Sequence, residues 1–173
     1  MTGEPLQIRE LRPDGVDDVA ELWQVLYEHH VAVGTRITEV SVAVDKRQSW
    51  QRRSELYRKW LSGPDAFGLV AEQVSRPVGY AMVRVQDGER GAIWEQRGRV
   101  AVLESLSVLP SIRGGGVGGA LLDAIKRRLL AQAVITLDLD VVASNLAAIR
   151  FYERHGFRES ITRMTSRIDA AED

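Results

Sequence analysis

The chain contains 173 residues with a formal net charge of −1, 45% hydrophobic residues and no cysteine. This size predicts a single domain over residues 1–173, and the composition argues against nucleic-acid binding and excludes disulfides and thiolate metal sites. No apolar run approaches the roughly 18 residues of a membrane span, and no signal-peptide pattern is present, so we expect no membrane contact and a cytoplasmic location.

The N-terminal part of the chain carries two kinds of periodic pattern. Alternating apolar and polar residues predict strands, and apolar residues that recur every three or four positions predict helices. The strands are expected over residues 6–11, 67–74 and 77–85, and the helices over residues 16–30 and 45–61. The polar stretch 86–99 is too long for a tight turn and is predicted to be a loop.

The C-terminal part continues the alternation of strands and helices. A strand is predicted over residues 100–109, a helix over 117–130, a second strand over 133–142 and a helix over 145–155 that ends at Gly156. Residues 158–168 favour one or two final strands. No internal repeat or linker divides the chain, which agrees with a single domain.

A glycine-rich run lies between the expected strand 100–109 and the expected helix 117–130. Residues 113–119 read RGGGVGG and hold five of the fifteen glycines of the chain. Glycine lets a backbone turn sharply and lie against a ligand, and the first amides of a helix have no intrahelical partner. With the positive end of the helix dipole, they predict a phosphate site. The lysine and hydroxyl residue of a P-loop are missing at the required offset, which argues against a triphosphate site.

A dinucleotide-binding oxidoreductase is an alternative interpretation of the same run. Gly114, Gly116 and Gly119 satisfy GxGxxG, and Asp138 and Asp140 follow at the distance of a ribose-binding acid. However, the loop does not follow its strand directly, and too little chain remains after it for the two halves of that fold. We therefore disfavour this interpretation.

Two further segments favour a different family. Arg113, Gly116 and Gly118 match [Gln/Arg]-x-x-Gly-x-[Gly/Ala], the segment LESLSVLPSIRGGGVGGALL surrounds them, and SNLAAIRFYERHGF follows. In this order they resemble the hallmarks of the Gcn5-related N-acetyltransferases (GNAT). The resemblance implies an α/β fold with a mixed, mostly antiparallel sheet of about seven strands and about four helices. Its cofactor-binding core is expected over residues 100–157.

The resemblance also implies acetyl-CoA as the acetyl donor and no metal. Acetyl-CoA is expected to wedge between the strand that ends near Val108 and the strand that ends near Val142, which splay apart. The expected cofactor-binding residues come from the strand, the loop and the last helix. They are Leu106, Ser107, Val108, Arg113, Gly114, Gly115, Gly116, Val117, Gly118, Gly119, Asn145, Ala148 and Tyr152.

Four residues are candidates for the chemistry of amine acetylation. The resemblance places the Val108 amide against the acetyl oxygen. Tyr152 lies seven residues after Asn145, on the same helix face, and as a phenol it can protonate a leaving thiolate. The base is left open among Glu104, Asp140 and solvent. Strict alternation groups Glu104 with Val102, Leu106 and Val108, although a β-bulge would change that phase.

The amine acceptor is not encoded in any motif. A small amine, an amino acid, an antibiotic and a protein N-terminus all remain candidates, and a non-catalytic acyl-CoA-binding domain is the alternative to an enzyme. Trp94 lies within the polar loop and could anchor it, touch a substrate or join a homodimer contact.

Overall fold

The computed structural model describes residues 5–89, 92–96 and 98–168, in which five strands form one mixed sheet. The strands are β1 (Gln7–Leu11), β2 (Ala66–Gln73), β3 (Arg76–Asp87), β4 (Arg99–Val108) and β5 (Thr136–Asp138). They lie in the order of their numbers, and each pair is antiparallel except β4 and β5, which are parallel. The predicted α/β class with a mostly antiparallel sheet is confirmed, with five strands where about seven were expected.

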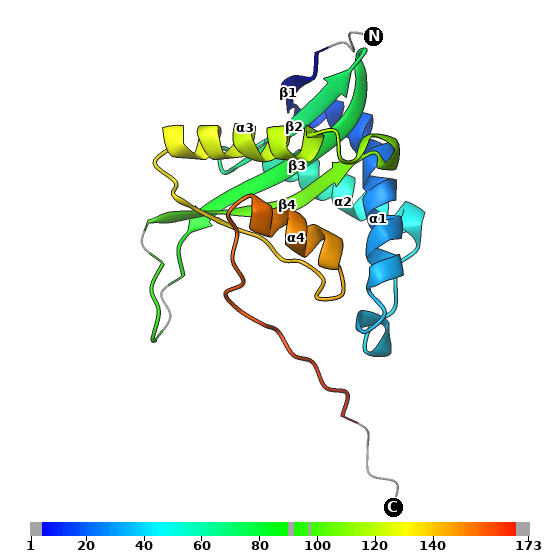
Figure 1. Cartoon of the computed structure of the whole chain (residues 1–173), viewed down its shortest axis with the longest axis vertical. Coiled ribbons are helices and arrows are strands. Elements are labelled where there is room, and N and C mark those ends of the chain that lie inside the picture. Colours follow the sequence, from blue (N-terminus) through cyan, green and yellow to red (C-terminus); the bar gives the residue numbers. More distant parts are fainter. Residues whose placement is uncertain (1–4, 90–91, 97, 169–173) are drawn as a thin grey trace, which may run out of the picture.

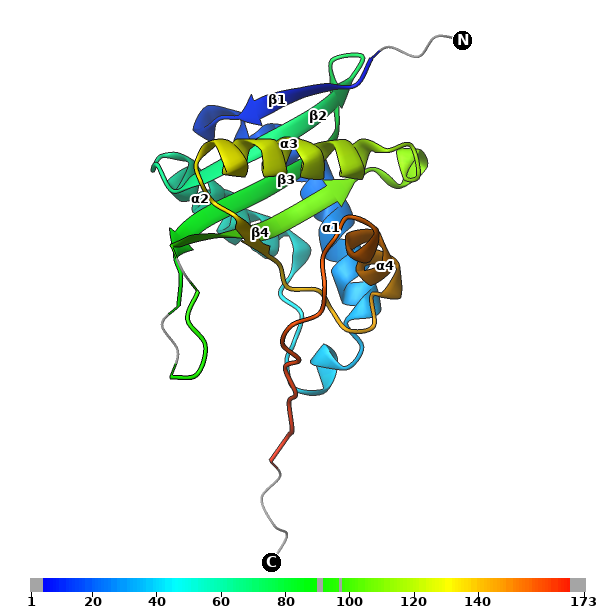
Figure 2. The ribbon, with the colours of Figure 1, turned by 60° about the vertical axis from the view of Figure 1, so that its left-hand side comes forward.

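Helices cover both faces of this sheet (Figures 1 and 2). The α-helices are α1 (Ala20–Val33), α2 (Lys46–Leu61), α3 (Val117–Ala131) and α4 (Leu146–Arg154). The 3₁₀ turns are η1 (Pro13–Val19), η2 (Ile37–Glu39) and η3 (Pro110–Ile112). Helices α1 and α2 pack against one face, α3 crosses the other, and α4 lies beside the end of β4.

The central strand β3 anchors the core because it is paired on both edges and covered on both faces. Tyr80, Met82 and Val83 of β3 are fully buried. The covering helices contribute regularly spaced apolar residues, such as Leu121, Leu122 and Ile125 of α3, which are also fully buried. Each such side chain removed from water stabilises the fold by about 1.5–3 kcal/mol. The sheet and its two helical layers therefore form a firm base for the ends of β4 and α3.

The loop predicted over residues 86–99 is an extension of the hairpin formed by β3 and β4. The Gly88 amide donates to the Gly98 carbonyl at 2.9 Å, and the Gln96 side chain reaches Asp138 of β5 at 3.0 Å. Residues 90, 91 and 97 of this loop lie outside the described residues. The Trp94 side chain is 83% exposed, so it does not anchor the loop to the domain.

Two strand predictions in the C-terminal part need correction. The strand expected over residues 133–142 forms only over Thr136–Asp138, because β4 offers partners to these three residues alone. Residues 158–168 form no strand and run away from the domain, with Ile161 and Ile168 88% and 94% exposed (Figure 1). A strand exists only where its peptide groups pair with those of a neighbouring strand, and residues 158–168 do not join the sheet that the structure describes.

Among the described helices, none combines the length and the apolar character that a membrane crossing requires.

Candidate active site

The glycine run forms a tight turn at the N-terminus of α3. Gly114 and Gly116 have φ of +85° and +83°, a region that other residues rarely adopt, and Gly116 is the N-cap. The Gly115 amide donates to the Ile112 carbonyl at 3.2 Å. Within the described residues no acceptor is found for the amides of Gly114, Gly116, Val117, Gly118 and Gly119. These five donors at the positive end of a helix can bind an anion such as a phosphate.

Arg113 connects this turn to the end of β4. Its Nε donates to the Val108 carbonyl at 3.2 Å, and the rest of its side chain is exposed. The guanidinium is therefore held at the end of β4, by the residue that begins the turn. It adds a fixed positive charge to the place where the amides already favour an anion.

One edge of β4 is free beyond its first half. Its pairing with β5 ends at Val102 and Asp138, so the residues from Leu103 to Val108 have no strand on that side. The strand that was expected to end near Val142 and splay from β4 ends at Asp138, so the free edge arises because the neighbouring strand stops there. The Leu109 amide donates to the Val78 carbonyl of β3 at 2.9 Å, and peptide groups alternate between the two edges of a strand. The peptide groups of Leu106 and Val108 therefore face the free edge.

Ser107, which lies between Leu106 and Val108 in β4, is bonded to helix α1. Ser107 is buried, and its hydroxyl donates to the Leu22 carbonyl of α1 at 2.8 Å. Its side chain thus fixes the strand against α1 and points to the face of the sheet that α1 covers, not along the free edge.

Helix α4 begins at a capping residue that the sequence motif contains. The Asn145 side chain is buried and accepts a hydrogen bond from the Ala148 amide at 3.2 Å. Such a cap stabilises a helix N-terminus by about 1 kcal/mol. Asn145 thus fixes the start of α4, and the position of Tyr152 along it.

Tyr152 is held by aromatic neighbours. Its ring meets Phe151 and Phe157 edge to face, at centroid distances of 5.2 and 5.4 Å. Burial raises the pKa of the Tyr152 phenol to about 12. Because this pKa lies far above neutrality, the phenol is protonated and can donate a hydrogen bond.

Helices α3 and α4 meet through two glycines of the loop motif. A Cβ added to Gly118 would lie 3.0 Å from Cζ of Phe151, and one added to Gly119 would lie 3.0 Å from Nε2 of His155. Both distances are tighter than ordinary van der Waals contact. These glycines therefore allow close helix packing in addition to exposing their amides, a role that the sequence motif did not reveal.

The two candidate bases occupy different environments. Glu104 is the extra residue of a β-bulge, since Met82 pairs with Ser105 and Val83 with Leu103. Its carboxylate is bound by Arg84 at 2.6 Å and is 18% exposed. The strict alternation considered for Glu104 is broken by this bulge. Asp140 follows β5, is exposed and has no hydrogen-bond or ion-pair partner in the part of the chain that the structure describes.

A buried hydroxyl network beside the bulge was not predicted. The Tyr57 hydroxyl donates to Oγ of Ser105 at 2.7 Å and lies 3.1 Å from the Tyr80 hydroxyl. Ser105 in turn donates to the Glu104 carbonyl at 2.7 Å, which satisfies a group that the bulge leaves unpaired. Burial raises the pKa of both tyrosines. The sequence shows these tyrosines only as apolar positions of a helix and a strand.

No group of three or more His, Asp or Glu side chains suited to a metal ion is found within residues 5–89, 92–96 and 98–168.

Comparisons with known proteins agree on one family. The model of the acetyltransferase (GNAT) family matches residues 20–157. The mycothiol acetyltransferase of Streptomyces griseus subsp. griseus is 33% identical over 156 residues, which are 89% of this chain but only 43% of that protein. This chain therefore spans less than half the length of that relative.

Solved structures show the same fold. The BH1408 protein from Bacillus halodurans, solved as a tetramutant, is 23% identical with a TM-score of 0.78, over 94% of this chain and 99% of that one. The aminoglycoside N-acetyltransferase AAC(6')-Iy, solved in complex with CoA, is 17% identical with a TM-score of 0.70, over 96% of both chains.

The contact between α3 and α4 leads to a stability prediction. Gly118→Ala places a methyl group against the Phe151 ring, so we expect it to destabilise the protein by about 1–3 kcal/mol. Gly63→Ala is the matched control, because its added Cβ would meet only the Trp60 carbonyl oxygen, at 3.6 Å. Urea denaturation measures both variants. Equal stability of the Gly118 variant and the wild type would show that α4 does not pack against α3 in this way.

Proposed function

The chain belongs to the acetyltransferase (GNAT) family, and on this premise we propose that it transfers the acetyl group of acetyl-CoA to a primary amine within a ternary complex. The observation that carries the proposal is the free edge of β4 next to the unpaired amides of α3. One ligand with an extended amide arm and a pyrophosphate can use both. We further propose that residues 1–173 form one domain.

The donor set fits this ligand. The amides of residues 114 and 116–119 and the Arg113 guanidinium would hold the pyrophosphate. The peptide groups of Leu106 and the carbonyl of Val108 would pair with the pantetheine arm as a neighbouring strand does. When bound, acetyl-CoA supplies the activated thioester. Recognition would then rest mainly on main-chain groups, which explains why the side chains at residues 114–119 are small.

The amide of Val108 would stabilise charge on the acetyl oxygen. It is fixed at the end of a strand whose other edge is bonded to β3, so it need not reorganise as charge develops. A preorganised donor of this kind supplies about 3 kcal/mol.

We assign the proton acceptor to Asp140 and a positioning role to Glu104. The Arg84 guanidinium occupies an oxygen of Glu104 at 2.6 Å, whereas Asp140 is unpaired within the described chain. As the amine nitrogen forms its bond to the acetyl carbon and the carbon–sulfur bond breaks, the amine proton passes to Asp140. The short aspartate side chain makes transfer through water the natural route.

Tyr152 would serve the leaving sulfur. Its pKa of about 12 keeps the phenol protonated. Full proton transfer to a thiolate, whose pKa is near 8.5, is uphill from such a phenol. The first role of Tyr152 is therefore to donate a hydrogen bond that stabilises the departing thiolate, with protonation completed as water re-enters.

Cofactor binding separates this proposal from a dinucleotide-dependent oxidoreductase. Acetyl-CoA at about 100 times its dissociation constant should stabilise the folded chain by about 2.7 kcal/mol, which corresponds to a rise in Tm of roughly 5–10 °C, and NAD should have no effect. Thermal denaturation measures the shift. Release of free thiol across a panel of amines then tests catalysis, and a stabilising effect of acetyl-CoA without any turnover would favour a non-catalytic binding domain.

Replacing the phenol should affect the chemistry and spare binding. For Tyr152→Phe we expect kcat to fall about tenfold to a hundredfold with little change in CoA affinity. Tyr27→Phe is the matched control, because its hydroxyl bonds only to the Val44 carbonyl, in the loop before α2. Since the pKa of Tyr152 is about 12, the wild-type rate should not decline below pH 10 through loss of its proton. An alkaline decline below pH 10 that disappears in Tyr152→Phe would contradict the assignment.

The two carboxylates can be distinguished by amide substitutions. Asp140→Asn should lower kcat about a hundredfold, because amidation removes the proton acceptor. Glu104→Gln keeps a hydrogen-bond acceptor for Arg84 and should have the smaller effect. Steady-state kinetics with the best amine of the panel measure both, and the reverse order of effects would move the base to Glu104.

A further inference from the structure

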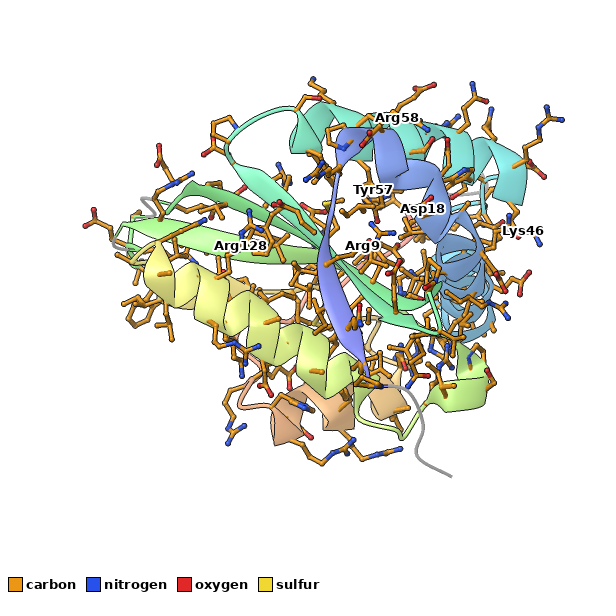
Figure 3. The ribbon with its side chains drawn as sticks, turned by 90° about the horizontal axis from the view of Figure 1, so that it is seen from above. Arg9, Asp18, Lys46, Tyr57, Arg58 and Arg128 are labelled. Carbon is orange, nitrogen blue, oxygen red and sulfur yellow. The ribbon has the colours of Figure 1, made fainter. Side chains whose placement is uncertain are left out.

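A cluster of aromatic rings and guanidinium groups lies between α1, α2 and the sheet. We call it the arginine–aromatic cluster, and it consists of Trp23, Arg53, Tyr57, Trp60 and Arg84. The Arg53 guanidinium lies 4.8 Å from the Trp23 ring centroid, 5.7 Å from that of Tyr57 and 6.0 Å from that of Trp60. Figure 3 shows Tyr57 on the side of α2 that faces the sheet.

The two guanidinium groups of the cluster differ in their partners. Arg84 lies 4.8 Å from the Trp60 ring centroid and forms an ion pair with Glu104. Arg53 is half-buried, and no carboxylate bonds to it among the residues that the structure describes. Aromatic faces compensate such a charge by only about 0.5–2 kcal/mol and leave its N–H donors unused. Arg53 is therefore a partly desolvated cation that can accept an anion.

A second donor beside Arg53 also lacks a partner. Trp23 is only 7% exposed, and its Nε1–H has no acceptor in the described chain. Buried donors without a partner are rare because each costs about 1–3 kcal/mol. The ring that carries this donor is the one on which the Arg53 guanidinium lies. Nε1 itself is shielded from solvent, so the group of the cluster that is open to a ligand is the half-buried Arg53 guanidinium.

The cluster is connected to the proposed transfer point through β4. The Tyr57 hydroxyl bonds to Ser105, which precedes Val108 by three residues. At about 3.3 Å per residue along a strand, Ser105 lies roughly 10 Å from Val108. The Arg53 guanidinium lies beyond Ser105, 5.7 Å from the Tyr57 ring centroid. The cluster lies on the face of β4 that α1 and α2 cover. The hydrogen bond from Ser107 to the Leu22 carbonyl of α1 is on the same face.

We propose that the arginine–aromatic cluster binds a carboxylate of the amine acceptor, so that the acceptor is an anionic amine whose carboxylate lies on the order of 10 Å from the nitrogen that is acetylated. This inference rests on the proposed function. Arg53 supplies the charged, fork-shaped contact, and the Trp23 ring supports its guanidinium. The acetylated amine then lies at the free edge of β4.

The charges of the cluster disfavour polycationic amines as acceptors. Its two arginines face one carboxylate, that of Glu104, and this carboxylate is already bound to Arg84. A polycationic amine would meet an unpaired guanidinium and no free acid. Like charges brought together in this way disfavour a partner, so the cluster selects against polyamines and aminoglycosides.

Matched acceptor pairs test the inference. Trialanine and trialaninamide share the same N-terminal amine and differ in one carboxylate, and 8-aminooctanoate and 8-aminooctanamide form a second pair. In wild-type protein we expect kcat/KM for each acid to exceed that for its amide at least tenfold. In Arg53→Gln the ratio should fall toward one, and Arg53→Lys should retain part of it. Arg52→Gln is the control, because Arg52 is the exposed neighbour on the same helix.

The outcomes separate the inference from the proposed function. Equal use of acid and amide, a preference for spermidine, or an unchanged ratio in Arg53→Gln would overturn the carboxylate site while leaving acetyl transfer intact. If neither pair is acetylated, saturable binding of N-acetyl-trialanine is measured by tryptophan fluorescence. Binding to wild type that is weakened at least tenfold in Arg53→Gln supports the site even if acetyl transfer fails, and no binding refutes it. Thermal denaturation confirms that each variant is folded.

Discussion

The constraint on which the site depends is the early end of the pairing between β4 and β5. Parallel strands normally satisfy each other's peptide groups along their whole length, but here only three residues of each strand are paired. The second half of β4 keeps its hydrogen bonds to β3, and its other edge is free to bind a ligand. The sheet thus supplies rigidity and unsatisfied hydrogen-bonding groups in the same strand. A ligand with amide groups of its own can complete this strand.

The two helices that flank this edge are positioned by small residues and a cap as well as by the apolar core contacts of α3. Gly116 ends the turn and begins α3, and Asn145 begins α4. Between the helices, Gly118 and Gly119 let the rings of Phe151 and His155 come close. The amides at the start of α3 and the phenol of Tyr152 are thereby held by the same helix contact. The contact between α3 and α4 therefore positions both the anion-binding amides and the candidate catalytic phenol.

Much of this arrangement could be predicted from sequence because it is encoded locally. The periodic patterns indicated all four helices, and the order of the glycine run and the Asn145 helix pointed to the family. What depends on distant partners could not be predicted. The bulge at Glu104, the bonds that join Tyr57 to Ser105, and the failure of residues 158–168 to pair all arise when separate segments meet. Apolar periodicity shows that Tyr57 and Trp23 are buried, but it gives no information on where their polar atoms point.

The close contact between α3 and α4 has a consequence for how this sequence can vary. A side chain at residue 118 and a large ring at residue 151 compete for the same space, since a Cβ on Gly118 would lie 3.0 Å from Phe151. The two positions are therefore epistatic: enlarging one is tolerated only after the other has been reduced. Because both lie at the contact between α3 and α4, an exchange of volume between them would change the spacing of these helices beside β4. A pair of compensating substitutions would thus adjust this spacing without replacing any polar side chain.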